Sequence, residues 1–244
     1  NTTLTNYPES KMGNIANGFY FDKERMNTLS SSAFTHPKTG ERKKVSKIDL
    51  WNDLETRKLI YERAYHLRHH QIVEKGLYDH KNPDGMFQHL RGVQLRPAME
   101  YLTDTQNQFK AYVAKVIYNH FKPKKVFDFS AGFAGRCLGA LSLNLDYIGI
   151  DSNTNLIEPY DKMLDVLSPY YNSTATIIFS QAENIDPKQF DYDFILTSPP
   201  YWNTKKKGQT ETYSNMEDYS EKAFFDKFLI PTACGAFKHL PENK

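Results

Sequence analysis

The sequence predicts an α/β protein with a doubly wound, mainly parallel sheet, preceded by an irregular and helical basic region. From residue 126 onward, short apolar runs alternate with segments of helical periodicity, which is the pattern of a parallel sheet with crossover helices. Several of these runs are followed by glycine, acidic or proline residues. Such residues at the carboxyl ends of parallel strands form the usual ligand crevice of an open α/β sheet.

The elements follow in a regular order. Strands are expected at residues 126–129, 147–150, 176–179 and 194–196, and helices at residues 136–143, 156–167 and 219–240. A further helix ahead of the first strand is expected to begin near Thr105, because Thr105 and Gln108 have the spacing of a capping box. Its apolar residues recur at helical spacing, so we expect this helix to pack against the sheet.

The first half of the chain differs in composition and periodicity. Residues 1–50 are polar and predict an extended arm or loosely packed loops, and residues 48–73 predict one or two helices. We therefore expect two regions, a basic region at residues 1–97 that contacts nucleic acid and a ligand-binding domain at residues 98–244.

Charge is unevenly distributed along the 244 residues. Residues 1–125 carry 21 Lys and Arg against 13 Asp and Glu, a net charge of +8, whereas residues 126–244 carry 10 against 16, a net charge of −6. A basic half joined to an acidic half suggests contact with nucleic acid, although an ordinary solvated surface gives the same count.

Other classes of protein are disfavoured by composition. There is no apolar run of the roughly 20 residues that a membrane span needs. The two cysteines form no disulfide framework, which indicates a reducing compartment and a cytoplasmic or nucleic-acid-associated protein. His66, His69 and His70 lack the separate second pair of ligands that a zinc site requires, so no metal is expected. The oligomeric state is not indicated.

The last apolar run is followed at once by two prolines. Neither Pro199 nor Pro200 has an N–H group for a sheet, so the strand must end there in a stiff turn. Ser198 adds a hydroxyl, and Tyr201 and Trp202 add aromatic rings. A surface turn would have the same composition, but the set suits a pocket for a planar ring that carries an amino group.

A glycine-containing loop follows the first strand. Gly132 and Gly135 allow a ligand to approach the backbone closely, although the third glycine of the dinucleotide fingerprint is missing. Asp151 ends the next strand, 19 residues after Gly132, where a carboxylate accepts both hydroxyl groups of a ribose.

Three segments together resemble the motifs of S-adenosylmethionine-dependent DNA amino-methyltransferases, which methylate cytosine N4 or adenine N6. They are residues 128–136 (DFSAGFAGR), 147–151 (YIGID) and 197–202 (TSPPYW). The resemblance covers about residues 100–240 and implies a class I, Rossmann-like methyltransferase fold with S-adenosylmethionine as cofactor. The implied partner is DNA, either a duplex with a flipped base or a single strand, and the implied setting is DNA methylation in a restriction-modification system of a bacterial or phage-like host.

The resemblance also implies roles for individual residues. Ser198, Pro199, Pro200 and Tyr201 would form the catalytic motif. The cofactor would contact Thr103, Thr105, Asp128, Ala131, Gly132, Asp151, Gln181 and Ala182. Contacts to nucleic acid would come from Trp202, Lys205, Lys206, Lys207, Arg42, Lys43 and Lys44.

Two departures from the family leave alternatives open. The family's last strands would follow residue 244, and no target-recognition region follows the proline motif, so we expect either a fragment or DNA contact by the basic first half. The alternatives are methylation of RNA or of a protein amide, and a catalytically inactive nucleic-acid-binding or scaffold subunit. Amide-methylating relatives usually carry Asn where Ser198 stands, which favours DNA.

Overall fold

A computed structural model of the chain describes residues 12–28, 33–74, 92–103, 108–200 and 220–241. The chain forms two compact units, one of Asn1–Glu24 with Asn107–Lys244 and one of Arg25–Gln106. This division differs from the expected boundary between residues 97 and 98, which falls inside helix α4 (Gly92–Leu102). The helix stays whole because Ala98 and Met99 belong to the hydrophobic cluster of the Arg25–Gln106 unit.

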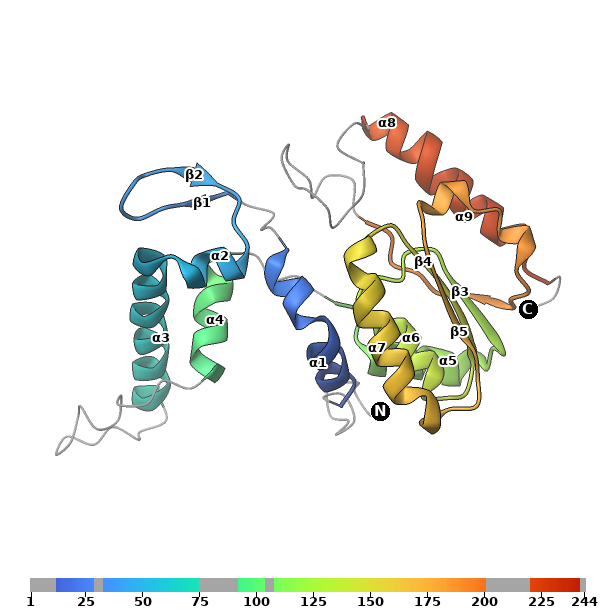
Figure 1. The fold of residues 1–244 in the computed structure, drawn as a ribbon, viewed down its shortest axis with the longest axis horizontal. Helices are drawn as coiled ribbons and strands as arrows, with labels where there is room; N and C mark the ends of the chain where they lie inside the picture. Colours follow the sequence, from blue (N-terminus) through green and yellow to red (C-terminus); the bar gives the residue numbers. More distant parts are fainter. Residues whose placement is uncertain (1–11, 29–32, 75–91, 104–107, 201–219, 242–244) are drawn as a thin grey trace. The chain divides into compact units, whose positions relative to one another are not determined.

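The first unit is built on a parallel sheet (Figure 1). Among the described residues the sheet has four strands in the order β5-β4-β3-β6. Their bounds are Lys125–Asp128 (β3), Asp146–Asp151 (β4), Ala175–Phe179 (β5) and Phe194–Ile195 (β6). Every pairing is parallel, which confirms the predicted α/β class with a mainly parallel sheet.

Strand β3 is the centre of this topology. It pairs with β4 through Phe127↔Ile148 and with β6 through Phe127↔Ile195. The chain runs outward from β3 to β4 and β5 and then returns to the other side of β3 for β6. The order of strands therefore reverses between β3 and β6, which is the position where open α/β sheets bind ligands.

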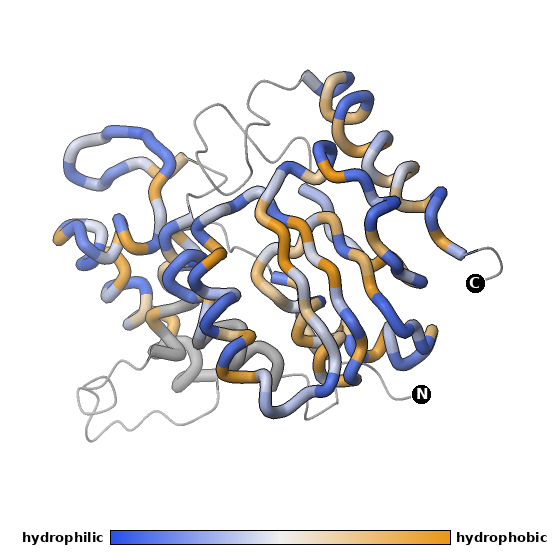
Figure 2. Tube along the Cα trace, turned by 45° about the vertical axis from the view of Figure 1, so that its right-hand side comes forward, coloured by the Kyte–Doolittle hydropathy of each residue, from blue (hydrophilic) through white to orange (hydrophobic). Residues whose placement is uncertain are grey.

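Alternate residues of β3 face opposite sides of the sheet. Val126 lies in one cluster with α5 (Ala111–Phe121), α6 (Gly135–Leu141) and α7 (Ile157–Leu167), and Phe127 lies in the other with the C-terminal helical segment. That segment consists of α8 (Glu221–Ala223), the π-helical η10 (Phe224–Leu229) and α9 (Ile230–Phe237). The strands are largely hydrophobic along their length (Figure 2), as expected for a sheet covered on both faces.

Helices α5 and α6 approach each other closely because two glycines lie between them. A Cβ atom on Gly135 would lie 1.8 Å from the carbonyl oxygen of Phe109, and one on Gly139 would lie 2.6 Å from the Cβ atom of Ala114. The predicted start of α5 is wrong. The helix begins at Ala111, and the preceding residue, Lys110, makes no side-chain cap. Residues 108–110 are not helical, because the backbone of Phe109 packs against Gly135 at the start of α6.

The Arg25–Gln106 unit is a small helical unit with a hairpin. Strands β1 (Phe34–Thr35) and β2 (Arg42–Lys43) pair antiparallel, and α2 (Lys47–Asn52), α3 (Leu54–Glu74) and α4 follow. Ser46 and Asp49 form a capping box that starts α2. The helices α2 and α3 confirm the one or two helices predicted at residues 48–73. Val45, Leu50, Ile60, Ala64, Ala98 and Met99 form its buried cluster.

Helix α1 (Met12–Asn27) lies where an irregular arm was expected. It forms because Phe21, fully buried, packs its ring against Tyr160 at a centroid distance of 5.1 Å and against Phe133 at 6.4 Å. This burial depends on residues far along the chain, which local polarity does not report. None of the described helices has the length and apolar character needed to cross a bilayer.

The glycines of α6 and α9 give a stability test. We expect Gly139→Ala to lower the free energy of unfolding by about 1–3 kcal/mol, because the new methyl group would overlap Ala114. Gly235→Ala is the matched change in α9, where the new Cβ would lie 3.6 Å from Pro187. It should raise the free energy of unfolding by up to about 1 kcal/mol, through helix propensity. Urea denaturation of both variants measures the difference, and equal effects would contradict the close packing of α5 on α6.

Candidate active site

The glycine loop and the proline motif leave the same edge of the sheet from adjacent strands. Residues 130–134 follow β3, and residues 197–200 follow β6. The two strands are parallel neighbours, and the N–H group of Leu196 donates to the carbonyl oxygen of Phe127 at 3.2 Å. The chain reaches both segments at the point where the strand order reverses, so the two motifs are brought side by side at the carboxyl edge.

The glycine loop is held from beneath by Tyr160 of α7. The Tyr160 hydroxyl donates to the carbonyl oxygen of Gly132 at 2.9 Å and accepts from the N–H group of Ala134 at 3.0 Å. The tyrosine is fully buried, and burial raises the pKa of its hydroxyl well above the usual value, so it stays protonated. Gly132 and Ala134 both have positive φ angles, of 57° and 60°. Tyr160 thus stabilises a tight turn that contains an alanine in the left-handed region.

Asp128, at the end of β3, is fully buried and its oxygens are occupied. Oδ2 accepts from Arg136 Nε at 2.6 Å and from the Tyr147 hydroxyl at 2.5 Å, and Oδ1 accepts from the Ser130 N–H group at 3.1 Å. Arg136 also donates from Nη2 to the Ser130 carbonyl oxygen and lies over the ring of Phe109. In this arrangement Asp128 fixes the backbone of the loop.

Asp151, at the end of β4, lies directly beside the loop. Its Oδ2 accepts from the Gly132 N–H group at 2.7 Å, and its Oδ1 accepts from the Asn153 N–H group at 2.9 Å. Burial raises the pKa of Asp151, and the hydrogen bonds from the backbone of Asn153 and Gly132 partly offset that rise. A carboxylate has about four acceptor positions. Asp151 therefore keeps acceptor capacity for hydroxyl groups of a ligand at the carboxyl edge of the sheet.

The residues after β5 join the same edge. The Ser180 N–H group donates to the carbonyl oxygen of Asp151 at 2.9 Å, so Gln181 and Ala182 follow next to the end of β4. Ala182 is buried in the cluster that contains Phe127. The structure therefore gathers Ala131, Gly132, Asp151, Gln181 and Ala182 at one edge, together with the proline motif.

Of the side-chain oxygens in this unit that are buried without a hydrogen-bond partner among the described residues, two belong to segments next to the glycine loop or the proline motif in the chain or in space. They are Oγ1 of Thr197, between β6 and Ser198, and Oε1 of Gln108, next to the Phe109 carbonyl that passes Gly135. A buried polar atom left unpaired costs about 1–3 kcal/mol. In the described part of the chain, unpaired oxygens also occur at Ser173 and Thr232, away from this edge, so they do not by themselves mark a site; where one lies at a site, a polar ligand can complete its hydrogen bonding.

The proline motif is described only in part. Ser198 is exposed, and Pro199 and Pro200 are half-buried. Several predicted site residues lie outside the described residues: Thr105, Tyr201, Trp202, Lys205, Lys206 and Lys207. Thr103 belongs to the Arg25–Gln106 unit, where it is buried and its hydroxyl donates to the Met99 carbonyl oxygen at 3.1 Å.

The predicted basic cluster belongs to the hairpin of the Arg25–Gln106 unit. Arg42 and Lys43 form β2 and are exposed, and Lys44 follows them half-buried. In the described ranges no group of three or more His, Cys, Asp or Glu side chains is arranged to hold a metal ion.

Tyr160 and Arg136 were not identified from the sequence as site residues. Tyr160 is separated from Gly132 by 28 residues, and no motif of the chain signals that pairing. Arg136 stands at the end of the glycine segment, but its charge suggested no buried partner. Its spacing of eight residues from Asp128 was the available signal.

No protein-family model matches this chain, and no curated protein matches it in sequence.

The role of Tyr160 is testable by hydrogen exchange. In Tyr160→Phe the buried Ala134 N–H group loses its acceptor, so amides of residues 131–135 should exchange faster and the free energy of unfolding should fall by about 1–3 kcal/mol. Tyr192→Phe is the matched control, because its buried hydroxyl donates to Ala236 on the other face of the sheet. If Tyr160→Phe leaves the exchange rates of the loop amides unchanged, the role given to the Tyr160 hydroxyl is wrong.

Proposed function

We propose that the protein is a class I methyltransferase that transfers a methyl group from S-adenosylmethionine to an exocyclic amino group of a DNA base. Cytosine N4 is favoured slightly over adenine N6, because the serine of the Ser198-Pro-Pro motif resembles the cytosine group. The observation that carries the proposal is the adjacency of β3 and β6, which puts the glycine loop and the proline motif at one edge of the sheet.

The residues at this edge fit the chemical groups of S-adenosylmethionine. Asp151 has acceptor capacity for the two ribose hydroxyls and is fixed in place by Gly132 and Asn153. Gln181 and Ala182 follow the next strand, where the adenine would lie. Thr197 Oγ1 and Gln108 Oε1, unpaired among the described residues, would be the acceptors for the ammonium group of the amino-acid end. Asp128 would support this end indirectly, because its oxygens already hold Arg136, Tyr147 and Ser130.

The proline motif supplies the chemistry of the amine. An exocyclic amino nitrogen is a poor nucleophile, because its lone pair is delocalised into the ring. The Ser198 hydroxyl and the Pro199 carbonyl oxygen would accept its two N–H groups and draw the lone pair back to nitrogen. Preorganised acceptors of this kind would stabilise the positive charge that develops on nitrogen as the N–C bond forms and the S–C bond of the sulfonium breaks. The products would be the thioether S-adenosylhomocysteine and a methylated amine that releases one proton to solvent. S-adenosylmethionine supplies a methyl group already activated by its bond to a sulfonium, so alignment provides much of the rate.

The activity test is transfer of a labelled methyl group to DNA, RNA and protein by the complete chain. We expect label in DNA, and mass spectrometry of the nucleosides then identifies N4-methylcytosine or N6-methyladenine. Label found only in RNA or only in protein would show that the proposed methyl transfer is right and that the proposed DNA substrate is wrong. Binding of nucleic acid without binding of the cofactor would favour an inactive scaffold.

Substitutions at the two ends of the site should separate their roles. Ser198→Ala should lower kcat by about tenfold or more with little change in cofactor affinity, because one acceptor for the amine is removed. Asp151→Ala should weaken cofactor binding, since the ribose acceptor is removed. Calorimetry with S-adenosylmethionine and single-turnover methylation measure the two effects. Equal loss of cofactor affinity in both variants would show that these roles are wrongly assigned.

Thr197 allows a test in which stability and binding move in opposite directions. Thr197→Val replaces an unpaired buried hydroxyl with a methyl group, so the free protein should become about 1 kcal/mol more stable. Affinity for S-adenosylhomocysteine should fall by about three- to tenfold, the value of one hydrogen bond. Affinity for methylthioadenosine, which lacks the amino-acid end, should not change.

Thr232 of α9 provides the matched control for this variant. Its Oγ1 is also buried and unpaired among the described residues, but it lies on the C-terminal helical segment. Thr232→Val should stabilise the protein in the same way and leave both affinities unchanged. If Thr197→Val weakens both ligands equally or neither of them, the contact between Thr197 and the amino-acid end is wrong.

A further inference from the structure

The hairpin β1–β2 concentrates positive charge on a short ribbon. Residues 34–47 contain five Lys or Arg and one Glu, a net charge of +4. Lys38, Arg42 and Lys43 are exposed, and the hairpin is predominantly hydrophilic along its trace (Figure 2). The one acidic residue, Glu41, pairs with Lys43 at 3.1 Å, an interaction between two exposed side chains that counterions or phosphates can replace at little cost.

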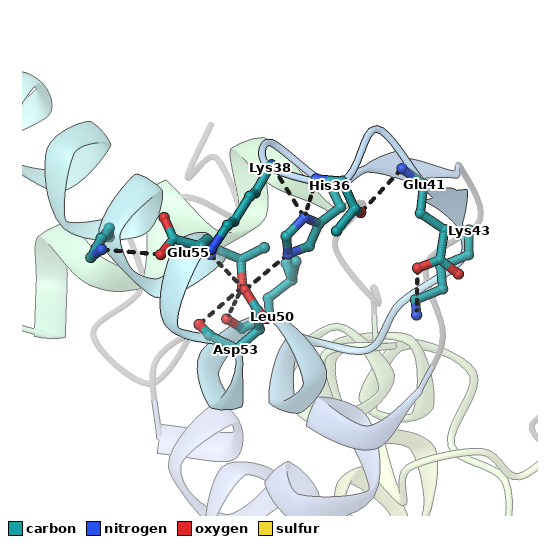
Figure 3. Close-up of polar contacts among 10 residues, drawn as sticks. His36, Lys38, Glu41, Lys43, Leu50, Asp53 and Glu55 are labelled. Carbon is teal, nitrogen blue, oxygen red and sulfur yellow. Dashed lines mark hydrogen bonds and ion pairs between the residues drawn. The ribbon is translucent and has the colours of Figure 1, made fainter.

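The turn of this hairpin is organised around His36 (Figure 3). The His36 N–H group donates to the Glu41 carbonyl oxygen at 2.8 Å, and the Gly40 N–H group donates to the His36 carbonyl oxygen at 2.9 Å. The ring nitrogen Nδ1 accepts from the N–H groups of Lys38 at 3.2 Å and Thr39 at 3.1 Å. The imidazole therefore fixes the turn from inside, and its ring hydrogen is on Nε2.

The same imidazole fastens the hairpin to helix α3. His36 Nε2 donates to Asp53 Oδ1 at 3.2 Å, and that oxygen also accepts from the Thr56 N–H group at 2.9 Å at the start of α3. The hydrogen bond from the Thr56 backbone and, after it, the interaction with His36 lower the pKa of Asp53. Asp53 thus joins the His36 imidazole of the hairpin to the first turn of α3, and we call these hydrogen bonds of Asp53 the latch.

We propose that hairpin β1–β2 is a DNA-binding element that enters the major groove of duplex DNA, with Arg42 and Lys43 on the phosphates and His36 as a positioning residue. A two-stranded β-ribbon fits the major groove of B-form DNA, whereas the major groove of duplex RNA is too narrow for side chains to read. A preorganised ribbon also loses less conformational entropy on binding than a mobile loop with the same charges. The proposal rests on the proposed function for its choice of DNA, and it says where in the chain the duplex is held.

The test is binding of the complete chain to a fluorescent duplex, without cofactor, over a range of salt concentrations. Combined substitution Arg42→Ala and Lys43→Ala should weaken binding to duplex DNA and reduce the magnitude of the salt slope by about one for each phosphate that is no longer neutralised. Lys162→Ala is the matched control, because Lys162 is also exposed and paired with a nearby acid, Glu158. It should change neither quantity.

A second test changes the latch hydrogen bonds of His36 and Asp53 and keeps every Lys and Arg of the hairpin. His36→Ala should weaken duplex binding while the salt slope stays the same, because the cations are present but no longer held in position. Asp53→Asn, whose amide oxygen can still accept from His36 and Thr56, should retain the affinity, whereas Asp53→Ala should lose it. Thermal unfolding of each variant checks that helix α3 remains folded.

The outcomes separate this inference from the proposed function. Wild-type binding to duplex DNA with no effect of the Arg42 and Lys43 substitutions would overturn the hairpin proposal and leave DNA methylation in place. If the Arg42 and Lys43 substitutions weaken binding to duplex DNA, duplex RNA and single strands equally, insertion of the hairpin into the major groove would be overturned. No binding of wild-type protein to DNA at low salt would overturn both the hairpin proposal and the choice of DNA as substrate.

Discussion

The buried ion pair between Asp128 and Arg136 is the interaction on which the candidate site depends. Both side chains are almost completely shielded from solvent, and the two residues bracket the glycine loop from the end of β3 to the start of α6. Breaking such a pair by removing one partner costs about 3–5 kcal/mol, since the other charge is left uncompensated. Asp128 also holds Ser130 and Tyr147, so one carboxylate connects the loop, β3 and β4.

The consequence of this pair is a loop that is rigid before any ligand arrives. Its backbone is held by Arg136 and Asp128 on one side, by Asp151 at Gly132, and by Tyr160 beneath. A loop fixed at so many points does not have to be ordered on binding, which reduces the entropic cost of association. The arrangement also stabilises Ala134 in the left-handed region, because in that conformation its N–H group donates to the buried Tyr160 hydroxyl.

The sheet was predictable from the sequence because each strand has a local signal. The apolar runs at residues 126–129, 147–150, 176–179 and 194–196 all correspond to strands, since a strand covered on both faces must be apolar throughout. The expected helix start at Thr105 failed for a tertiary reason, the contact of Phe109 with Gly135. Helix α1 was missed because its polar composition hides one buried aromatic residue, Phe21, whose partners lie more than 100 residues away.

The part of the candidate site that lies at the ends of neighbouring strands could be predicted from the sequence. The contacts between side chains that are distant in the sequence could not. Asp151 and Gly132 could be expected together, because they follow adjacent parallel strands, and a hydrogen bond joins them. Tyr160 could not, because its contact requires a helix to cross back over the loop. The role of Asp128 was also hidden. A carboxylate at a strand end can face a ligand or turn inward to a cation, and only the position of Arg136 decides between them.

The contrast between Asp128 and Asp151 follows from that choice. Both carboxylates end neighbouring strands of one sheet, but Asp128 has a buried guanidinium partner, whereas Asp151 is held by the backbone N–H groups of Gly132 and Asn153. Burial without a bonded cation raises the pKa of Asp151, so its ionised form gains from any further donor that reaches it. Hydroxyl groups of a ribose are such donors, and they would lower that pKa on binding. The carboxylate that is less completely satisfied by the protein is therefore the one suited to hold a ligand.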